Sequence, residues 1–282
     1  MRPDAGFGLT AFRAIIYKES MAEMTLLLSF GQTVQGYWNT IATAIQDFFS
    51  QMTFFINVGK TLEKYYGFFL EGTKNTLIIA FFTVLLGTIL GVLMAMAKLS
   101  GFKPLKWLAT AYIEFFRGTP LLVQLMFIFY GLPMIGVKFP DVSFIPDFQR
   151  FAAGIVAMSL NSCAYVAEII RSGIQAVDGG QMEAARSLGF TRGQAMRMVV
   201  LPQAVKNILP ALGNEFVTII KESSIVSVIG IADLMYRTNG VKAKNYKTLE
   251  CLFIAAMIYF IMTFIGGRLI ALMERRMNRG RK

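Results

Sequence analysis

The chain has 282 residues, of which 55% are hydrophobic and only 16% are charged, and its mean hydropathy of +0.54 is typical of an integral membrane protein. The formal net charge is +11, but Lys and Arg flank apolar segments and form no basic face with stacking aromatics, so lipid headgroups explain this charge better than nucleic acid. Histidine is absent, and Cys163 and Cys251 lie in apolar segments without metal or disulfide spacing, so we expect no metal site and no redox function.

The first part of the chain lacks a clear membrane span. Residues 1–20 are not a convincing secretory signal, because Lys18 and Glu19 follow too short an apolar run. Residues 38–58 are weakly amphipathic and are interrupted by polar side chains, so they predict an interfacial helix and not a span. We therefore expect residues 1–71 to form an N-terminal extension that is interfacial or partly disordered.

One short stretch in this extension has the appearance of a nucleotide site. Gly59, Lys60 and Thr61 are like the end of a phosphate-binding loop, but Phe54 occupies the position of the required earlier Gly, and no strand precedes it. The match is accidental. We expect the chain to hydrolyse no ATP and to hold no cofactor of its own.

Five later segments are long and apolar enough to span a membrane, because a span needs about 20 mostly apolar residues. Gly87 and Gly91 in the first form a GxxxG pair, which predicts close approach by another helix. The second contains Arg117-Gly118-Thr119-Pro120 and is expected to be kinked or to begin with a non-spanning helix. The five segments cover about residues 74–97, 108–132, 151–171, 203–221 and 249–272.

The distribution of Lys and Arg predicts the orientation of these spans. The loops after the first, third and fifth spans are basic, which places them in the cytoplasm, with residues 275–282 as a basic tail. Residues 222–248 disagree, because an odd number of crossings places their four Lys and Arg residues outside. Three loops outweigh one, and residues 224–234 are apolar enough to fold back against the bundle.

The most informative polar segment, residues 183–202, reads EAARSLGFTRGQAMRMVVLP and lies between the third and fourth spans. Gly189 suits a left-handed residue that closes a short helix over about residues 181–188. Thr191 and Gln194 have capping-box spacing, which predicts a second helix that stops before Pro202. Such a helix, turn and helix could fit a cleft on a soluble partner, with Met182, Ala185 and Leu188 on one side and Arg186, Arg192 and Arg197 elsewhere.

Polar residues inside spans are costly and therefore mark a candidate path. The third span carries a stripe at helical spacing, and the fourth carries another with Glu215 beside it. Gln124 follows the break in the second span. The stripes consist of Gly154, Asn161, Tyr165, Glu168 and Ser172, and of Asn207, Asn214, Thr218 and Lys221.

Glu215 has several interpretations. It lies 13 residues after Pro202, or about 20 Å along a helix, near or just beyond the midplane. A buried carboxylate needs a cation or a proton, so Glu215 is a counter-charge for a basic substrate, a hydrogen-bonded packing residue, or a partner for Lys221 near the outer surface. For Asn161 and Gln124, the competing interpretation is a hydrogen bond between helices.

These segments resemble one known family, the permease subunits of bacterial type I ABC importers, in the branch that takes up polar amino acids. The polar segment is similar to the EAA loop of that family at Glu183, Ala184, Ala185, Gly189, Val199, Leu201 and Pro202. The resemblance extends over about residues 72–274. It is carried further by YIEFFRGTPLLVQL from Tyr112, NSCAYVAEIIRSGIQAV from Asn161 and NILPALGNEFVTIIKESSIVSVIGIADL from Asn207.

The resemblance implies an all-α integral membrane protein of the bacterial cell membrane, with a five-helix transmembrane domain and a cytoplasmic coupling helix in residues 178–202. It also implies ATPase subunits docked on that loop, a second permease subunit, identical or different, and an extracellular binding protein. The expected substrate is a polar amino acid such as arginine, histidine, lysine or glutamine. The alternative function is an ion-coupled secondary transporter or channel, which has no use for a docking loop.

Overall fold

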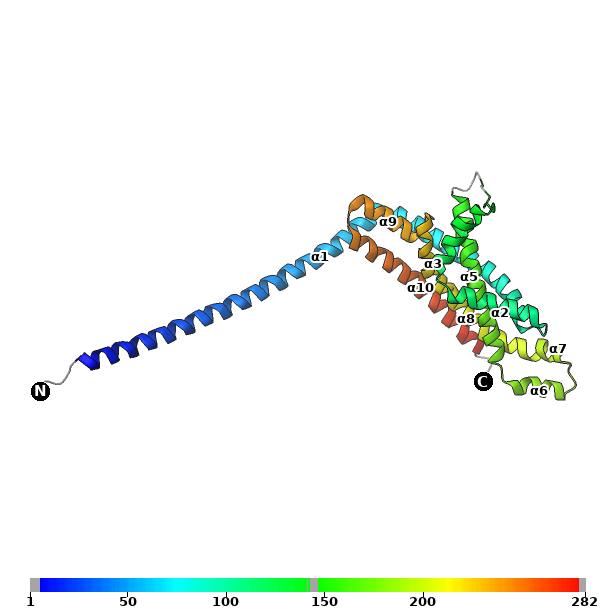
Figure 1. Ribbon diagram of the computed structural model, residues 1–282, viewed down its shortest axis with the longest axis horizontal. Coiled ribbons are helices and arrows are strands. Elements are labelled where there is room, and N and C mark those ends of the chain that lie inside the picture. Colours follow the sequence, from blue (N-terminus) through cyan, green and yellow to red (C-terminus); the bar gives the residue numbers. More distant parts are fainter. Residues whose placement is uncertain (1–5, 141, 143–146, 279–282) are drawn as a thin grey trace. The chain divides into compact units, whose positions relative to one another are not determined.

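The computed structural model describes residues 6–140, 142 and 147–278, which contain helices and no strand (Figure 1). The chain divides into two compact units, residues 1–59 and 60–282. The first unit consists, where it is described, of one helix whose side chains from Ser29 to Gln51 are exposed. The second unit carries all the predicted spans.

The helices of the second unit follow the predicted order. They are the later part of α1 (Gly6–Leu99), α2 (Lys103–Gly118), α3 (Leu121–Met126), α4 (Leu132–Met134), α5 (Phe148–Gln175), α6 (Gly179–Ser187), α7 (Arg192–Ala195), α8 (Leu201–Glu222), α9 (Leu234–Asn245) and α10 (Thr248–Asn278). Three of the connections are helical turns that are wider (π) or tighter (3₁₀) than an α-helix. These are the π-helical turns Phe127–Gly131 and Met196–Val200 and the 3₁₀ helix Ser223–Ile229.

Helix α1 is longer than the sequence predicts. Residues 38–58 lie inside a longer helix, and the range Gly6–Leu99 consists of two helices that meet at a kink, where Tyr65 has non-helical dihedral angles. No proline lies between Met21 and Lys98, and the few glycines are isolated, so nothing in the sequence forces the helix to stop. The division into an extension and a transport domain at residue 71 stays a prediction.

The core of the second unit lies where α1, α5, α8 and the 3₁₀ helix meet. Ile79 of α1, Ala157 of α5 and Ile220 of α8 are at most 1% exposed and belong to one apolar cluster. Val226 and Ile231 join the same cluster. The prediction that residues 224–234 fold back against the bundle is therefore confirmed.

The GxxxG pair has the role expected from its spacing. A Cβ atom on Gly87 would lie 2.8 Å from Ser162, and one on Gly91 would lie 2.6 Å from Val166. Both distances are shorter than a real Cβ contact, so α1 and α5 approach so closely only because these positions have no side chain.

The second predicted segment is broken. Helices α2 and α3 meet at 107° across Thr119 and Pro120. Pro120 has no amide hydrogen, and it restricts Thr119 to the extended conformation that the structure shows. The structure shows the break that is common to both expectations, a kinked span and a non-spanning first helix. This break leaves backbone carbonyls that need other partners.

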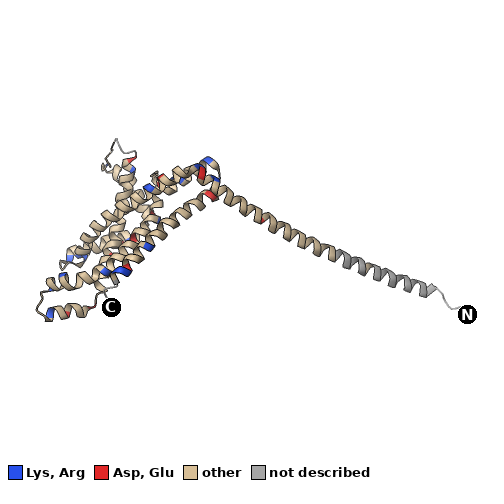
Figure 2. Cartoon of the chain, turned by 180° about the vertical axis from the view of Figure 1, so that it is seen from behind, with Lys and Arg blue, Asp and Glu red and all other residues tan. Residues whose placement is uncertain are grey.

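The described residues contain three helices long and apolar enough to cross a membrane, or four if α2 with α3 and α4 is counted as one span. Helix α8 has 22 residues, about 33 Å at 1.5 Å per residue, but its polar stripe lowers its hydropathy. The count of five spans stays a prediction. In Figure 2, Lys, Arg, Asp and Glu residues are seen near the ends of the helices. Figure 1 shows α6 and α7 at one end of the bundle with α9 at the other.

Candidate functional site

The segment between α5 and α8, residues 178–202, is called the coupling loop below. Its first helix, α6, begins after Asp178, whose carboxylate accepts a hydrogen bond from the Gly180 amide at 2.7 Å. The helix ends at Ser187, and Gly189 has a φ of +89°, with its amide donating to the Arg186 carbonyl at 3.0 Å. The predicted short helix and its left-handed closing glycine are confirmed.

The second helix of the coupling loop begins as expected but ends differently. The Thr191 hydroxyl accepts from the Gln194 amide at 3.3 Å, and the Thr191 amide donates to the Gln194 side chain at 2.9 Å, so the capping box is confirmed. The expectation that this helix stops before Pro202 is wrong. A π-helical turn, Met196–Val200, carries the chain directly into α8, where Pro202 lies in the first turn and needs no amide donor.

The coupling loop has a groove lined by charged and polar residues. A groove of about 720 Å³ is lined by residues of α6 and of the turn that follows it. Glu183 is exposed there beside Arg186 and Arg192. The complete lining is Gly179, Met182, Glu183, Arg186, Ser187, Gly189, Phe190 and Arg192.

The apolar residues of α6 do not share one environment, contrary to the predicted common side. Ala185 is 4% exposed, Met182 is half-buried, and Leu188 is 80% exposed. Leu188 follows the last residue of α6, so the turn of the helix no longer directs it toward Ala185. Ala184 is also exposed, and Leu201 and Pro202 lie in the first turn of α8.

Glu215 of α8 faces α5. Its Oε1 accepts a hydrogen bond from the Ser162 hydroxyl at 3.3 Å. The residue is half-buried, and none of the ion pairs among the described residues includes it. The expected alternative pairing with Lys221 is therefore wrong, because Lys221 lies nearly two helical turns further on and is exposed.

Asn161 and Gln124 form a network that fills the break between α2 and α3. The Gln124 amide donates to the Phe116 carbonyl at 2.9 Å, and to the Thr119 carbonyl at 3.1 Å and hydroxyl at 2.7 Å. Asn161 donates to the Gln124 Oε1 at 2.9 Å and to the Phe116 carbonyl at 3.2 Å. These bonds satisfy the carbonyls that the break leaves free, which favours the packing interpretation for both residues.

The remaining predicted path residues are dispersed. Asn214 is exposed and Thr218 is half-buried on α8, near Glu215. Tyr165, in contrast, lies on an exposed part of α5, where the Arg117 guanidinium is 5.4 Å from its ring centre. The stripe on α5 is thus a helical face whose members contact different neighbours, because Asn161 points to α2 and α3.

The structure contains an ion-pair network at the cytoplasmic ends of α1 and α5 that the sequence analysis did not predict. Lys98 Nζ lies 3.1 Å from Glu168 Oε2, and the Arg171 guanidinium contacts both oxygens of the same carboxylate. Both side chains of the Lys98–Glu168 pair are at most 20% exposed. The spacing of Glu168 and Arg171 is a usable signal for their pair, but Lys98 is 70 residues away and gives none.

The described residues form a multi-helix membrane domain in which a helix, a left-handed turn and a capped helix are exposed between two long helices. Comparison with known proteins identifies the class of this domain. Residues 87–279 match the family of binding-protein-dependent transport system inner membrane components. The chain belongs to this family, and it is the permease subunit of an ABC importer. ATP hydrolysis in such importers belongs to a separate subunit, so the channel alternative is not supported. The match begins 15 residues later than the resemblance at residue 72.

Several curated proteins are similar to this chain over most of their length. The arginine transport system permease protein ArtQ of Bacillus subtilis is 48% identical over 203 residues, which is 71% of this chain and 89% of that protein. The putative glutamine transport system permease protein GlnP of Rickettsia felis is 42% identical, covering 74% and 93%. The probable glutamine ABC transporter permease protein GlnM of Bacillus subtilis is 37% identical, covering 76% and 95%.

Solved structures agree with the fold. The crystal structure of an amino acid ABC transporter with histidines is similar with a TM-score of 0.71 and 50% identity, over 76% of this chain and 96% of that one. The MetNI methionine ABC transporter is similar with a TM-score of 0.55 and 19% identity, over 74% and 98%, and supports the fold alone.

Proposed function

We propose that this permease moves polar amino acids with a basic or amide side chain into the cytoplasm. Two observations support this substrate class. Relatives named for arginine and for glutamine are 48% and 42% identical to the chain, and a carboxylate with no cationic partner among the described residues lies between α5 and α8.

Glu215 is the proposed counter-charge for the substrate side chain. A carboxylate inside a membrane domain is costly unless a cation or donors compensate it. The Ser162 hydroxyl supplies one donor at 3.3 Å, which leaves acceptor capacity for a guanidinium, an ammonium or an amide. Asn214 and Thr218 on the same helix are proposed as neighbouring contacts, and Asn161 and Gln124 are proposed to be packing residues. Tyr165, which is exposed beside Arg117, is left out of the proposed path.

The coupling loop is the proposed docking site for the ATPase. Its turn is fixed by Gly189 and its second helix by the capping box, so a preformed surface with Glu183, Arg186 and Arg192 at one groove is available to a partner. The family works with an ATPase, a second permease and an extracellular binding protein. We propose that ATP binds only to the partner ATPase and that this chain needs no cofactor.

The test is ATP-dependent uptake in proteoliposomes that contain the purified complex with its ATPase and binding protein. We expect uptake of labelled arginine or glutamine only when two conditions are met. ATP must be on the side of the membrane that carries the ATPase, and the binding protein must be present on the opposite side. Matched vesicles without the ATPase are the control. Equal uptake in those vesicles would contradict the ATP-driven mechanism, and ATP-dependent uptake of neither amino acid would contradict the substrate class.

A further inference from the structure

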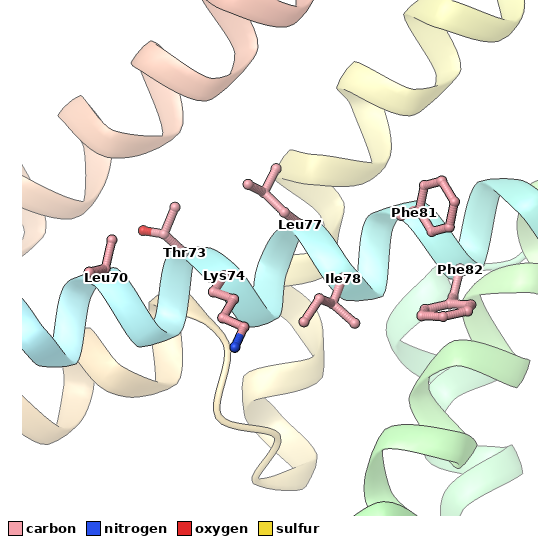
Figure 3. Close-up of a pocket in the computed structure, with 7 residues that line it drawn as sticks. All are labelled: Leu70, Thr73, Lys74, Leu77, Ile78, Phe81 and Phe82. Carbon is pink, nitrogen blue, oxygen red and sulfur yellow. The ribbon is translucent and has the colours of Figure 1, made fainter.

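Helices α1 and α5 touch at Gly87 and Gly91 and separate toward their N-terminal ends. A groove of about 670 Å³ lies between them where they diverge. Ile78, Phe82 and Leu86 form its wall on α1, and Ile155 and Val156 form part of the opposite wall on α5. Figure 3 shows that Ile78 and Phe82 project to the side of α1 opposite to Leu77 and Phe81.

The groove has an apolar interior and a polar mouth. Its apolar stretch on α1 extends from Ile78 to Leu86, about 12 Å at 1.5 Å per residue. That length is close to the depth of one leaflet, about 15 Å or half of the hydrocarbon thickness. Glu71, Asn75, Asp147 and Arg237 line the other end, which faces outside because the Lys98 end of α1 and the coupling loop are cytoplasmic.

The mouth carries opposite charges side by side. Arg237 forms an ion pair with Glu71 in the lining, and Asp147 of the lining pairs at 3.1 Å with Arg150, which lies next to the groove and does not line it. The Arg237 Nε is buried and has no hydrogen-bond partner among the described residues. The two guanidinium groups and the two carboxylates have a net charge of zero. An anionic ligand is attracted by the guanidinium groups but repelled by the carboxylates, and the reverse holds for a cationic ligand. A zwitterion, in contrast, can place each of its charges next to a group of opposite charge.

We propose that this groove binds one phospholipid of the outer leaflet with a zwitterionic headgroup. Apolar grooves in a membrane domain exclude water, and the surrounding solvent supplies acyl chains that fill the space between the aliphatic walls and gain dispersion contacts. The phosphate binds at Arg237, and the amine of the headgroup lies near Glu71 and Asp147. The proposal depends on membrane insertion and not on the identity of the transported substrate.

The first experiment measures retained lipid. The complex is reconstituted with phosphatidylethanolamine, extracted in mild detergent and studied by native mass spectrometry. We expect one tightly held phospholipid for each copy of this chain. Ala152→Phe, which places a ring in the groove, should lower that occupancy by roughly tenfold or more, while Ala256→Phe on exposed α10 should not. Size-exclusion chromatography with the ATPase checks that both variants assemble. Equal occupancy in both variants would overturn the proposal.

The second experiment identifies the headgroup contact. Arg237→Gln removes a charge-assisted hydrogen bond to phosphate and should lower occupancy by about tenfold. Lys74→Gln, near the same level of α1 but outside the groove lining, is the matched control. Phosphatidylglycerol replacing phosphatidylethanolamine without loss of occupancy would overturn the zwitterionic assignment.

The third experiment distinguishes lipid from protein in the intact membrane. A photoreactive benzoylphenylalanine at Val156, whose side chain is 36% exposed in the groove wall, should cross-link to phospholipid. A cross-link to a second permease copy, or the absence of any adduct, would overturn the proposal. A protein adduct would assign the groove to a subunit interface.

Discussion

The coupling loop and the network around Gln124 are both polar interruptions in an apolar chain, and the structure uses them in opposite ways. In the coupling loop the backbone is satisfied locally, by Asp178, Thr191 and Gln194, which leaves Glu183 and Arg186 exposed. In the network, Gln124 is 6% exposed and its amide bonds to Phe116 and Thr119, so no capacity is left for a ligand.

The difference shows how to interpret polar residues in a membrane protein. A polar side chain that completes the hydrogen bonding of a broken helix is structural, because removing it leaves buried carbonyls without donors. Where the backbone hydrogen bonds of a segment are already satisfied by local caps, its other polar side chains are available to contact a partner protein or ligand. Glu215, with one long contact to Ser162, lies between these two cases.

Gly189→Val is expected to have the largest effect on transport. A β-branched residue at a φ of +89° is strained, so the turn between α6 and α7 should reorganise and the docking surface should be lost. We expect ATP-dependent uptake in vesicles to fall by roughly tenfold or more, with unchanged protein in the membrane. Gly193→Ala is the control, because no atom of the described residues outside its own helix backbone lies within 4 Å of the added Cβ. Uptake near the wild-type rate in Gly189→Val would show that the turn is dispensable.

Glu215→Gln should change the choice of substrate. If the carboxylate meets a positive side chain, the loss of a charge-assisted contact costs about 1.5–3 kcal/mol. Arginine affinity should then fall by about one to two orders of magnitude, and glutamine affinity far less. Competition between the two labelled amino acids in the same proteoliposomes measures this ratio. Equal losses for both would assign Glu215 to packing.

Gln124→Leu should lower stability and spare transport. The substitution leaves the Thr119 carbonyl without its Gln124 donor, and the Phe116 carbonyl keeps only the donor from Asn161, at a cost of about 1–3 kcal/mol. We expect a lower thermal unfolding temperature in detergent but nearly the same uptake per folded complex. Gln149→Leu, at an exposed position of α5, controls for the change in hydrophobicity. A specific loss of substrate affinity in Gln124→Leu would return this residue to the transport path.

Asp233→Asn should have the smallest effect, visible mainly in the pH dependence of stability. Burial in the segment that folds back raises the pKa of Asp233 from 3.8 to about 6. The folded state thus binds this proton more tightly, so its contribution to stability is complete below the unfolded pKa and is lost as the pH rises through about 6.

The variant keeps one side-chain oxygen, which can accept from the Tyr236 amide as Asp233 Oδ1 now does at 2.8 Å, but it loses the Oδ2 that accepts from the Met235 amide at 3.1 Å. Thermal unfolding at about pH 5 and about pH 7.5 should therefore show a smaller difference in the variant than in the wild type. An unchanged or larger difference would show that Asp233 does not titrate in this range.

Local features were predictable from the sequence because their causes are local. The closing Gly189, the capping box at Thr191 and the break at Pro120 each depend on residues a few positions apart. The close approach at Gly87 was also predictable, because small residues at this spacing have few other uses in a membrane helix.

Features that depend on distant partners were not predictable in the same way. The role of Asn161 depends on Gln124, which is 37 residues away, and that of Glu168 depends on Lys98, which is 70 residues away. The prediction that the second helix of the coupling loop stops before Pro202 was wrong, because a π-helical turn connects α7 to α8 and Pro202 lies in the first turn of α8. The periodicity of the polar residues on α5 correctly predicted that they share one face of a helix, but periodicity does not identify which neighbouring helix each residue contacts.

The most direct test of the central claim, that the coupling loop docks the ATPase, is site-specific photo-cross-linking in the assembled transporter. Benzoylphenylalanine at Leu188, which is 80% exposed beside Gly189, should form an adduct with the ATPase. The same probe at Tyr246, which is 89% exposed at the end of α9, should form none. An ATPase adduct at Tyr246 and not at Leu188, or at neither position in a complex that still hydrolyses ATP and transports, would contradict the account.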